Sequence, residues 1–163
     1  MYNTSIGILQ NAEDAEDTAQ EVFIQVYHTI KQFKGESKLS TWLYRVTVTR
    51  SLDHLRAKKR KKRFAFVQSL FGAESNEPLS EQTSFVHPGV QLENKERAGI
   101  LFSAIAKLPE NQKIAFTLNK VEGLSYDEVA EVMQTSVSSV ESLLFRAKNN
   151  LKTHLQYYYK ERD

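Results

Sequence analysis

Cysteine is absent from this chain of 163 residues, and there is a single tryptophan. Without a thiol the protein cannot form disulfides or use a thiolate nucleophile, which fits a reducing compartment. No apolar run approaches the length that spans a membrane, and the N-terminus lacks the apolar core of a signal peptide. We therefore expect a cytoplasmic protein with no membrane insertion.

The common motifs of catalysis are missing as well. The four histidines are scattered along the chain and none belongs to an HExxH motif, and there is no phosphate-binding glycine loop. Isolated histidines at such spacings are more often surface or packing residues than metal ligands. We expect no enzymatic activity, no cofactor, no metal site and no small-molecule substrate.

Basic residues, in contrast, are concentrated in one place. The run Arg56–Arg63, RAKKRKKR, has seven basic residues out of eight. Such a block repels itself unless a polyanion neutralises it, so a phosphate backbone is its natural partner. The preceding segment supplies Trp42 and other groups that can stack on bases and bridge phosphates. In the alternative interpretation Trp42, Leu43, Val46 and Val48 are core residues and the lysines only solvate a helix end.

The charges of the chain are strongly partitioned. Residues 1–33 carry one basic and five acidic groups, and residues 34–63 carry eleven and two. Residues 64–92 carry none and three, and residues 93–163 carry ten and ten, for a net charge of +2. A basic middle flanked by acidic segments indicates one surface for nucleic acid and another for a protein partner.

Two helices are expected in the first half. The first begins at Asn11, a plausible N-cap with Asp14 three residues on, and ends at Gly35. The second runs from Leu39 to about Lys62, although its β-branched residues weaken the propensity. The apolar stripe of the first helix is Ala15, Ala19, Val22, Val26, Ile30 and Phe33.

Helical periodicity fails between about residues 64 and 91, where glycine, proline and serine give the composition of a linker. We therefore expect an all-α protein of two small helical domains, residues 1–63 and 93–163, joined by a flexible linker over residues 64–92. The apolar residues at the start of the linker either continue the preceding helix or dock on a surface. They are Phe64, Phe66, Leu70 and Phe71.

The second half has the outline of a helix-turn-helix. Helices are expected over residues 93–107 and 110–122, with stops at Leu108-Pro109 and Gly123. Ser125 and Glu128 form an S-x-x-E capping box in front of a short helix, Tyr126 to Met133. After an interruption at residues 134–136 a longer helix follows, capped by Ser136. Its apolar stripe is Val137, Val140, Leu144, Ala147 and Leu151.

One face of that last helix carries side chains that project away from the stripe, where they could meet a major groove. These are Ser138, Ser142, Phe145, Arg146 and Asn149. The alternative is an ordinary three-helix bundle with a solvated face, since this half has no net charge and the set contains one arginine.

Two runs of the sequence resemble a known family. NAEDAEDTAQEVFIQVYHTIKQFKGESKLSTWLYRVTVTRSLDHLRAKKRKKR is similar to region two of bacterial RNA polymerase sigma factors of the extracytoplasmic-function subfamily. LPENQKIAFTLNKVEGLSYDEVAEVMQTSVSSVESLLFRAKNNL is similar to region four of the same subfamily. The runs cover most of the chain in the family's order, which makes the pair far more specific than either alone.

The resemblance implies that the first domain binds core RNA polymerase and captures the promoter's minus-ten element as a single strand. The implied polymerase contacts are Asp17, Gln20, Glu21 and Gln25. The loop Lys34 to Ser40 matches the one that receives an extruded base, and Trp42 matches the aromatic residue at the edge of the opened duplex. The implied minus-ten contacts are Lys38, Trp42, Arg45, Thr49, Arg50, Asp53, Arg56, Lys58, Lys59 and Arg60.

The resemblance also implies that the last helix reads the minus-thirty-five element, and that an anti-sigma factor is a further partner. The implied minus-thirty-five contacts are Ser138, Ser139, Ser142, Phe145, Arg146, Lys148 and Asn149. A sigma factor performs no catalysis of its own. The competing hypothesis is a stand-alone helix-turn-helix regulator, which would bind DNA tightly without polymerase.

The chain departs from the family pattern in three places. The segment Tyr2 to Gln10 is shorter than the helix and a half that relatives usually have there, so we expect an internal start codon or a less stable first domain. Glu141 and Leu143 occupy positions where many relatives are basic, and Gln134-Thr135 replaces a glycine and an aliphatic residue in the turn. The base preference is therefore not predicted.

Overall fold

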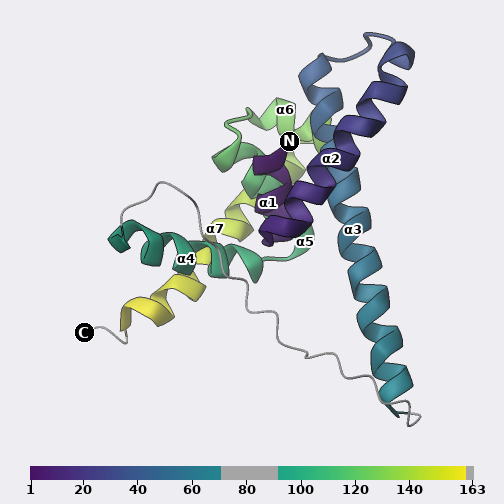
Figure 1. The fold of residues 1–163 in the computed structure, drawn as a ribbon. Helices are drawn as coiled ribbons and strands as arrows, with labels where there is room; N and C mark the ends of the chain where they lie inside the picture. The colour runs from purple at the N-terminus through teal and green to yellow at the C-terminus, as the bar shows by residue number, and fades with distance from the viewer. Residues whose placement is uncertain (71–91, 161–163) are drawn as a thin grey trace.

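The computed structural model describes residues 1–70 and 92–160, and within these ranges it contains helices and no strand. This confirms the all-α class (Figure 1). The elements in chain order are α1 (Tyr2–Leu9), α2 (Ala12–Thr29), η1 (Ile30–Gln32), α3 (Leu39–Leu70), α4 (Leu92–Ala106), α5 (Glu110–Phe116), η2 (Thr117–Val121), α6 (Tyr126–Met133) and α7 (Val137–Lys160).

The first helix, α1, was not expected from the sequence pattern. All of its residues from Thr4 to Leu9 are buried, and Gln10 ends it in the left-handed conformation with φ of 58°. A helix that is buried all round shows no amphipathic period, which is why its sequence gives no helical signal. It packs against α2, α3 and the second half of the chain.

The boundaries of α2 agree with the prediction at one end and differ at the other. Asn11 Oδ1 accepts a hydrogen bond of 2.8 Å from the Asp14 backbone N–H, so the predicted cap is confirmed. The helix ends at Thr29 and tightens into the 3₁₀ turn η1, whereas Gly35, with φ of 74°, lies in the loop beyond it. The prediction that Gly35 ends the helix is therefore wrong.

The long helix α3 continues past Lys62 to Leu70, so the backbone follows the first of the two alternatives left open for the residues after 63. Phe71 and the rest of the predicted linker to residue 91 lie outside the described residues. Thr47, one of the β-branched residues, is buried and donates its hydroxyl to the Leu43 carbonyl at 2.8 Å. That bond satisfies the hydroxyl inside the packed helix.

In the second half, the helix expected over residues 110–122 is divided. An α-helical part, α5, ends at Phe116 and continues as the π-helical turn η2 before Gly123, with φ of 74°. The capping box of α6 is present in both directions, with bonds of 3.2 and 3.0 Å between Ser125 and Glu128. The predicted start of α6 is thereby confirmed.

The helix α7 begins at Val137 as predicted, and Ser136 Oγ accepts a 3.2 Å hydrogen bond from the Ser139 N–H. Four members of its predicted stripe are buried, whereas Val137 at the first turn is 37% exposed. The buried members are Val140, Leu144, Ala147 and Leu151.

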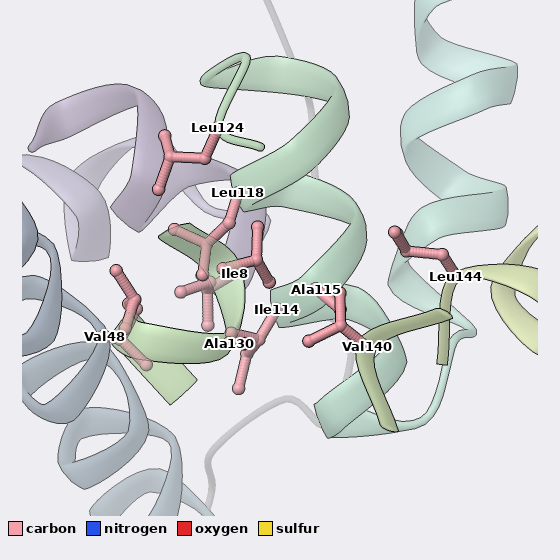
Figure 2. Packing of buried hydrophobic residues seen from close by; sticks show 11 residues of the cluster. Ile8, Val48, Ile114, Ala115, Leu118, Leu124, Ala130, Val140 and Leu144 are labelled. Carbon is pink, nitrogen blue, oxygen red and sulfur yellow. The ribbon is translucent and has the colours of Figure 1, made fainter. Parts of the chain in front are cut away.

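The two halves of the chain share a hydrophobic core (Figure 2). Ile8 of α1 and Val48 of α3 belong to the same cluster as Leu118, Leu124 and Ala130 from the second half. In Figure 2 these side chains converge on a common interior. The contact between the halves therefore includes buried apolar surface as well as polar bonds.

Candidate nucleic-acid and protein interfaces

The predicted polymerase contacts lie on α2. Asp17, Gln20 and Glu21 are exposed there. Gln25 is half-buried, and its side-chain oxygen accepts a hydrogen bond from Nε of Arg50 on α3. The structure thus joins one predicted polymerase contact to one predicted minus-ten contact.

An apolar patch beside these residues was missed by the sequence reasoning. Phe23 and Ile24 are each 60% exposed and Tyr27 is 79% exposed. Together with Val26 and His28 they line an open hollow of about 580 Å³. Large side chains on the solvent face of an amphipathic helix mark an interaction surface. The sequence feature that could have revealed this patch is that these large apolar residues lie on α2 outside its buried stripe.

The N-terminal end of α3 carries the predicted aromatic platform. Trp42 is half-buried and its ring lies 5.5 Å from the ring of Phe33, tilted by 46°. Trp42 belongs to none of the three buried core clusters of the described residues. A partly exposed ring next to the loop of residues 34–40 retains a surface on which a base could stack.

The neighbouring minus-ten residues Lys38 and Arg45 are engaged by α6. Lys38 Nζ lies 3.1 Å from Glu128 Oε1. Arg45 donates from Nε and Nη2 to the Glu131 carbonyl oxygen, at 3.0 and 2.8 Å. Thr41 donates its hydroxyl to the Glu131 carboxylate at 3.2 Å. Part of the predicted DNA-binding surface is therefore covered by the second half of the chain.

The remaining predicted minus-ten residues of this part of α3 face solvent. Thr49 and Asp53 are exposed, and Asp53 accepts a hydrogen bond of 3.3 Å from Arg56 one turn on. In the basic block, Lys58 lies 2.9 Å from Asp14 of α2, and Lys59 lies 3.5 Å from Glu110 of α5. Each of these two lysines thus forms an ion pair with a neighbouring helix of the free chain.

The other basic residues of the block are Arg60, Lys61, Lys62 and Arg63, and all four are exposed. Exposed cations on consecutive helical positions surround the helix with positive potential, which phosphates neutralise. The surface available for a nucleic-acid backbone therefore begins at Arg60, directly after the two lysines that pair with carboxylates.

Glu122 connects three elements across the contact between the halves. Its carboxylate accepts hydrogen bonds from Thr4 of α1 at 2.8 Å and from Tyr44 of α3 at 3.1 Å. Burial and the neighbouring Glu122 charge raise the pKa of Tyr44 to about 12. Tyr44 therefore keeps its proton and remains a donor at physiological pH.

Two further pKa shifts reflect the same contact. Hydrogen bonding to Ser125 and then the charge of Lys38 lower the pKa of the Glu128 carboxyl group, which favours its ionised form. Burial, and then the charge of Lys59, lower the pKa of Lys113 on α5.

The predicted minus-thirty-five contacts gather on the open face of α7. Phe145 is 67% exposed, and Arg146 donates Nε to the Ser142 carbonyl at 3.1 Å, one turn back. Ser139 is half-buried, and its N–H donates to the capping hydroxyl of Ser136. The other exposed members of the set are Ser138, Ser142, Arg146, Lys148 and Asn149.

Within residues 1–70 and 92–160, no three histidine, aspartate or glutamate side chains lie close enough together to hold a metal ion. Among the same residues, no helix is both long and apolar enough to cross a bilayer.

Two family models match the chain in separate stretches. The model described as Sigma-70 region 2 matches residues 2–61, and the one described as Sigma-70, region 4 matches residues 98–151. The ECF RNA polymerase sigma-E factor of Haemophilus influenzae is 35% identical over 143 residues, which cover 88% of this chain and 75% of the relative. RNA polymerase sigma-H factor of Pseudomonas aeruginosa is 32% identical over 161 residues, which cover 93% and 78%.

Solved structures show the same fold. The sigma factor RpoE from Bartonella quintana, in complex with the anti-sigma factor NepR, matches with a TM-score of 0.62 at 20% identity, over 95% of this chain and 89% of that one. CnrH, in complex with the cytosolic domain of CnrY, matches with a TM-score of 0.63 at 20% identity, over 96% and 79%.

A helix-turn-helix with an exposed face on its second helix, in one chain with a strongly cationic long helix, is the architecture of a DNA-binding protein. The chain belongs to the extracytoplasmic-function subfamily of the sigma-70 family. The sigma-factor interpretation is thereby favoured over the stand-alone regulator, because both family regions occur in order in one polypeptide. The relatives are sigma factors, which are not enzymes.

Proposed function

We propose that this chain binds core RNA polymerase through the exposed face of α2 and directs the enzyme to promoters that it reads with α3 and α7. The observation that carries the proposal is the occurrence of both sigma regions in one chain, each with an exposed helix of matching chemistry. Polymerase catalyses bond formation, and the sigma chain contributes binding energy. The chain acts in the cytoplasm, where that enzyme works.

The α2 surface suits a protein partner better than DNA. It combines the acidic and amide groups Asp17, Gln20 and Glu21 with the apolar residues Phe23 and Tyr27. An apolar centre with a charged rim is typical of protein interfaces, and the acidic rim favours a basic partner surface.

On the DNA side, α3 offers a partly exposed aromatic ring followed by cations. Trp42 can stack on a base at the edge of an opened duplex, and Arg60 and the cations after it can hold phosphates. Extruding a base costs a few kcal/mol, which stacking and the loop of residues 34–40 would recover. On α7, Ser142, Arg146 and Asn149 supply hydrogen-bond donors and acceptors for base edges.

An anti-sigma factor is a further proposed partner. Two structural neighbours of this chain were solved as complexes, RpoE with the anti-sigma factor NepR and CnrH with the cytosolic domain of CnrY. The apolar patch around Phe23 and Tyr27 is a surface that such an inhibitor could cover in competition with polymerase.

The direct test is transcription in vitro with purified bacterial core polymerase and a library of promoter fragments. We expect the chain to bind duplex DNA weakly alone and to give core enzyme a strong preference among templates. Tight, sequence-specific binding by the free chain, with no effect on core enzyme, would instead support the stand-alone regulator.

A further inference from the structure

We infer that Glu141 determines base specificity in the upstream promoter element, by accepting a hydrogen bond from the N4 amino group of a cytosine in the major groove. Glu141 lies on α7 and is exposed. It is also one of the positions at which the sequence departs from the family pattern. The inference rests on the proposed function, in which α7 reads the minus-thirty-five element, and it adds the base that this carboxylate selects.

The local structure of α7 does not account for the Glu141 carboxylate. The helix is capped by Ser136, and Glu141 lies beyond the first turn, where the helix dipole has little effect. The residues three and four positions away, where an ion pair would form along the helix, are all uncharged. They are Val137, Ser138, Leu144 and Phe145.

Glu141 also lacks a partner farther away. Arg146, the nearest cation along α7, donates Nε to the Ser142 carbonyl. Within residues 1–70 and 92–160, the Glu141 side chain forms no ion pair and accepts no hydrogen bond. The carboxylate is therefore free to accept a hydrogen bond from a molecule that docks on α7.

Glu141 lies beside other side chains of the predicted reading face. Ser138 precedes it by three residues and Phe145 follows it by four, so these residues are neighbours on adjacent turns. Ser138 is exposed, and Phe145 is 67% exposed. In a helix-turn-helix, the N-terminal residues of the second helix contact base edges. The place of Glu141 just after the first turn therefore brings it to the bases.

Two lysines continue the same side of α7 toward its C-terminal end. Lys148 and Lys152 are exposed, and they follow Glu141 by about two and three turns at 3.6 residues per turn. At 1.5 Å per residue they lie roughly 10 and 16 Å farther along the helix axis. This side of α7 thus has a carboxylate near the base edges and cations where the helix passes the phosphate backbone.

A carboxylate in a DNA groove discriminates strongly among the four bases. When ionised it only accepts hydrogen bonds, and the surrounding phosphates repel it. In the major groove, guanine and thymine present acceptors, and adenine presents the N7 acceptor beside its N6 amino group. Cytosine presents the N4 amino donor with no acceptor next to it, so it is the base that a glutamate matches. On any other base the Glu141 carboxylate would weaken binding.

The test uses the holoenzyme formed by the full chain with purified core polymerase. Selection from a duplex DNA library randomised over the promoter length identifies the sequence that the parent prefers. Competition binding is then measured on sets of four templates that differ at one upstream base pair. We expect the parent to prefer cytosine at one position by roughly tenfold, which is typical of a good contact between a side chain and a base.

Two substitutions should change the preferred base in directions that hydrogen-bond chemistry fixes. Glu141→Gln supplies a donor and an acceptor, which match N6 and N7 of adenine. Glu141→Arg supplies two donors, which match O6 and N7 of guanine. Glutamine and arginine favour helices about as well as glutamate does, and the position is exposed, so both variants should fold. Thermal unfolding of the free chain checks this.

The matched control is Lys148→Gln, which also replaces an exposed charge on α7 with a neutral amide. It should weaken binding to all four templates alike, because a lysine on a phosphate carries no base information. It should also lower the slope of log affinity against log salt by about one, since one fewer counterion is released.

Three results would overturn the inference. Equal strengthening on all four templates by Glu141→Gln would show that the carboxylate only repels phosphates. An unchanged base preference in both Glu141 variants would show that it does not reach the bases, and a parent preference for another base at the responding position would show that it does not select cytosine. In each case the proposed function stands. A holoenzyme that selects no sequence from the library would reject the proposed function and this inference together.

Discussion

At the scale of single residues, ion pairing distinguishes cations that contact neighbouring helices from cations available to DNA. Lys58 and Lys59 lie in the middle of the basic block and contact carboxylates of α2 and α5. Arg60 and the three residues after it are exposed. A basic block that looks uniform in sequence therefore contains residues that pair with carboxylates of the chain and residues that remain available to phosphates.

Trp42 provides a residue-scale prediction. Trp42→Ala should lower open-complex formation on a duplex promoter roughly tenfold, since base stacking contributes about 1–3 kcal/mol. Binding to core polymerase should change little, because the predicted polymerase face is on α2. Permanganate footprinting measures opening, and Trp42→Phe is the matched control because it keeps an aromatic face. Normal opening by the alanine variant would show that the ring serves packing.

The α2 surface provides a second prediction. Asp17→Lys with Glu21→Lys should weaken core-enzyme binding about tenfold through lost charge complementarity, while the melting temperature of the free chain stays within about two degrees because both side chains are exposed. Fluorescence anisotropy with labelled core enzyme measures the affinity. Glu13→Lys with Glu16→Lys is the control for total charge, and equal weakening by both pairs would count against a contact at Asp17 and Glu21.

At the scale of elements, local chemistry fixes several helix ends. The box formed by Ser125 and Glu128 starts α6, and the Asn11 side chain starts α2. Such caps depend on residues three positions apart, so they can be recognised without any tertiary contact. The end of α2 depends on how the loop after it packs, and there the sequence prediction was wrong.

The α6 cap yields an element-scale prediction. Ser125→Ala should lower the free energy of unfolding by about 1 kcal/mol, since it leaves the Glu128 N–H without its side-chain acceptor. Urea denaturation followed by circular dichroism at 222 nm measures the change. Ser125→Thr retains the acceptor and should cost much less. Equal losses in the two variants would mean that the cap does not stabilise α6.

At the scale of the whole molecule, the shared core makes the halves energetically dependent on each other in the free chain. Leu118 is fully buried in the cluster that also holds Ile8 and Val48. Burial of that kind joins the unfolding of neighbouring units into one cooperative event.

The corresponding prediction concerns Leu118→Ala, which should destabilise the free chain by about 2–5 kcal/mol through the cavity it leaves. The fluorescence of Trp42, the single tryptophan, reports on the first half, and circular dichroism reports on the helices of both halves; the two signals should shift together in urea. Phe145→Ala, an exposed residue of α7, is the control and should have little effect. A shift confined to the second half would show that the two halves unfold independently.

The sequence by itself determined the helical class, the capped starts of α2, α6 and α7, and the cationic block. It also determined the membership in the sigma-factor family that the two sigma-like runs suggested. These features depend on residues close together along the chain, so local chemistry and spacing reveal them. Only the tertiary structure decided that α1 is a buried helix, that Phe23 and Tyr27 face outward, and that Arg45 binds the Glu131 carbonyl 86 residues away. Such pairings depend on which surfaces pack together, and no local pattern in the sequence encodes that choice.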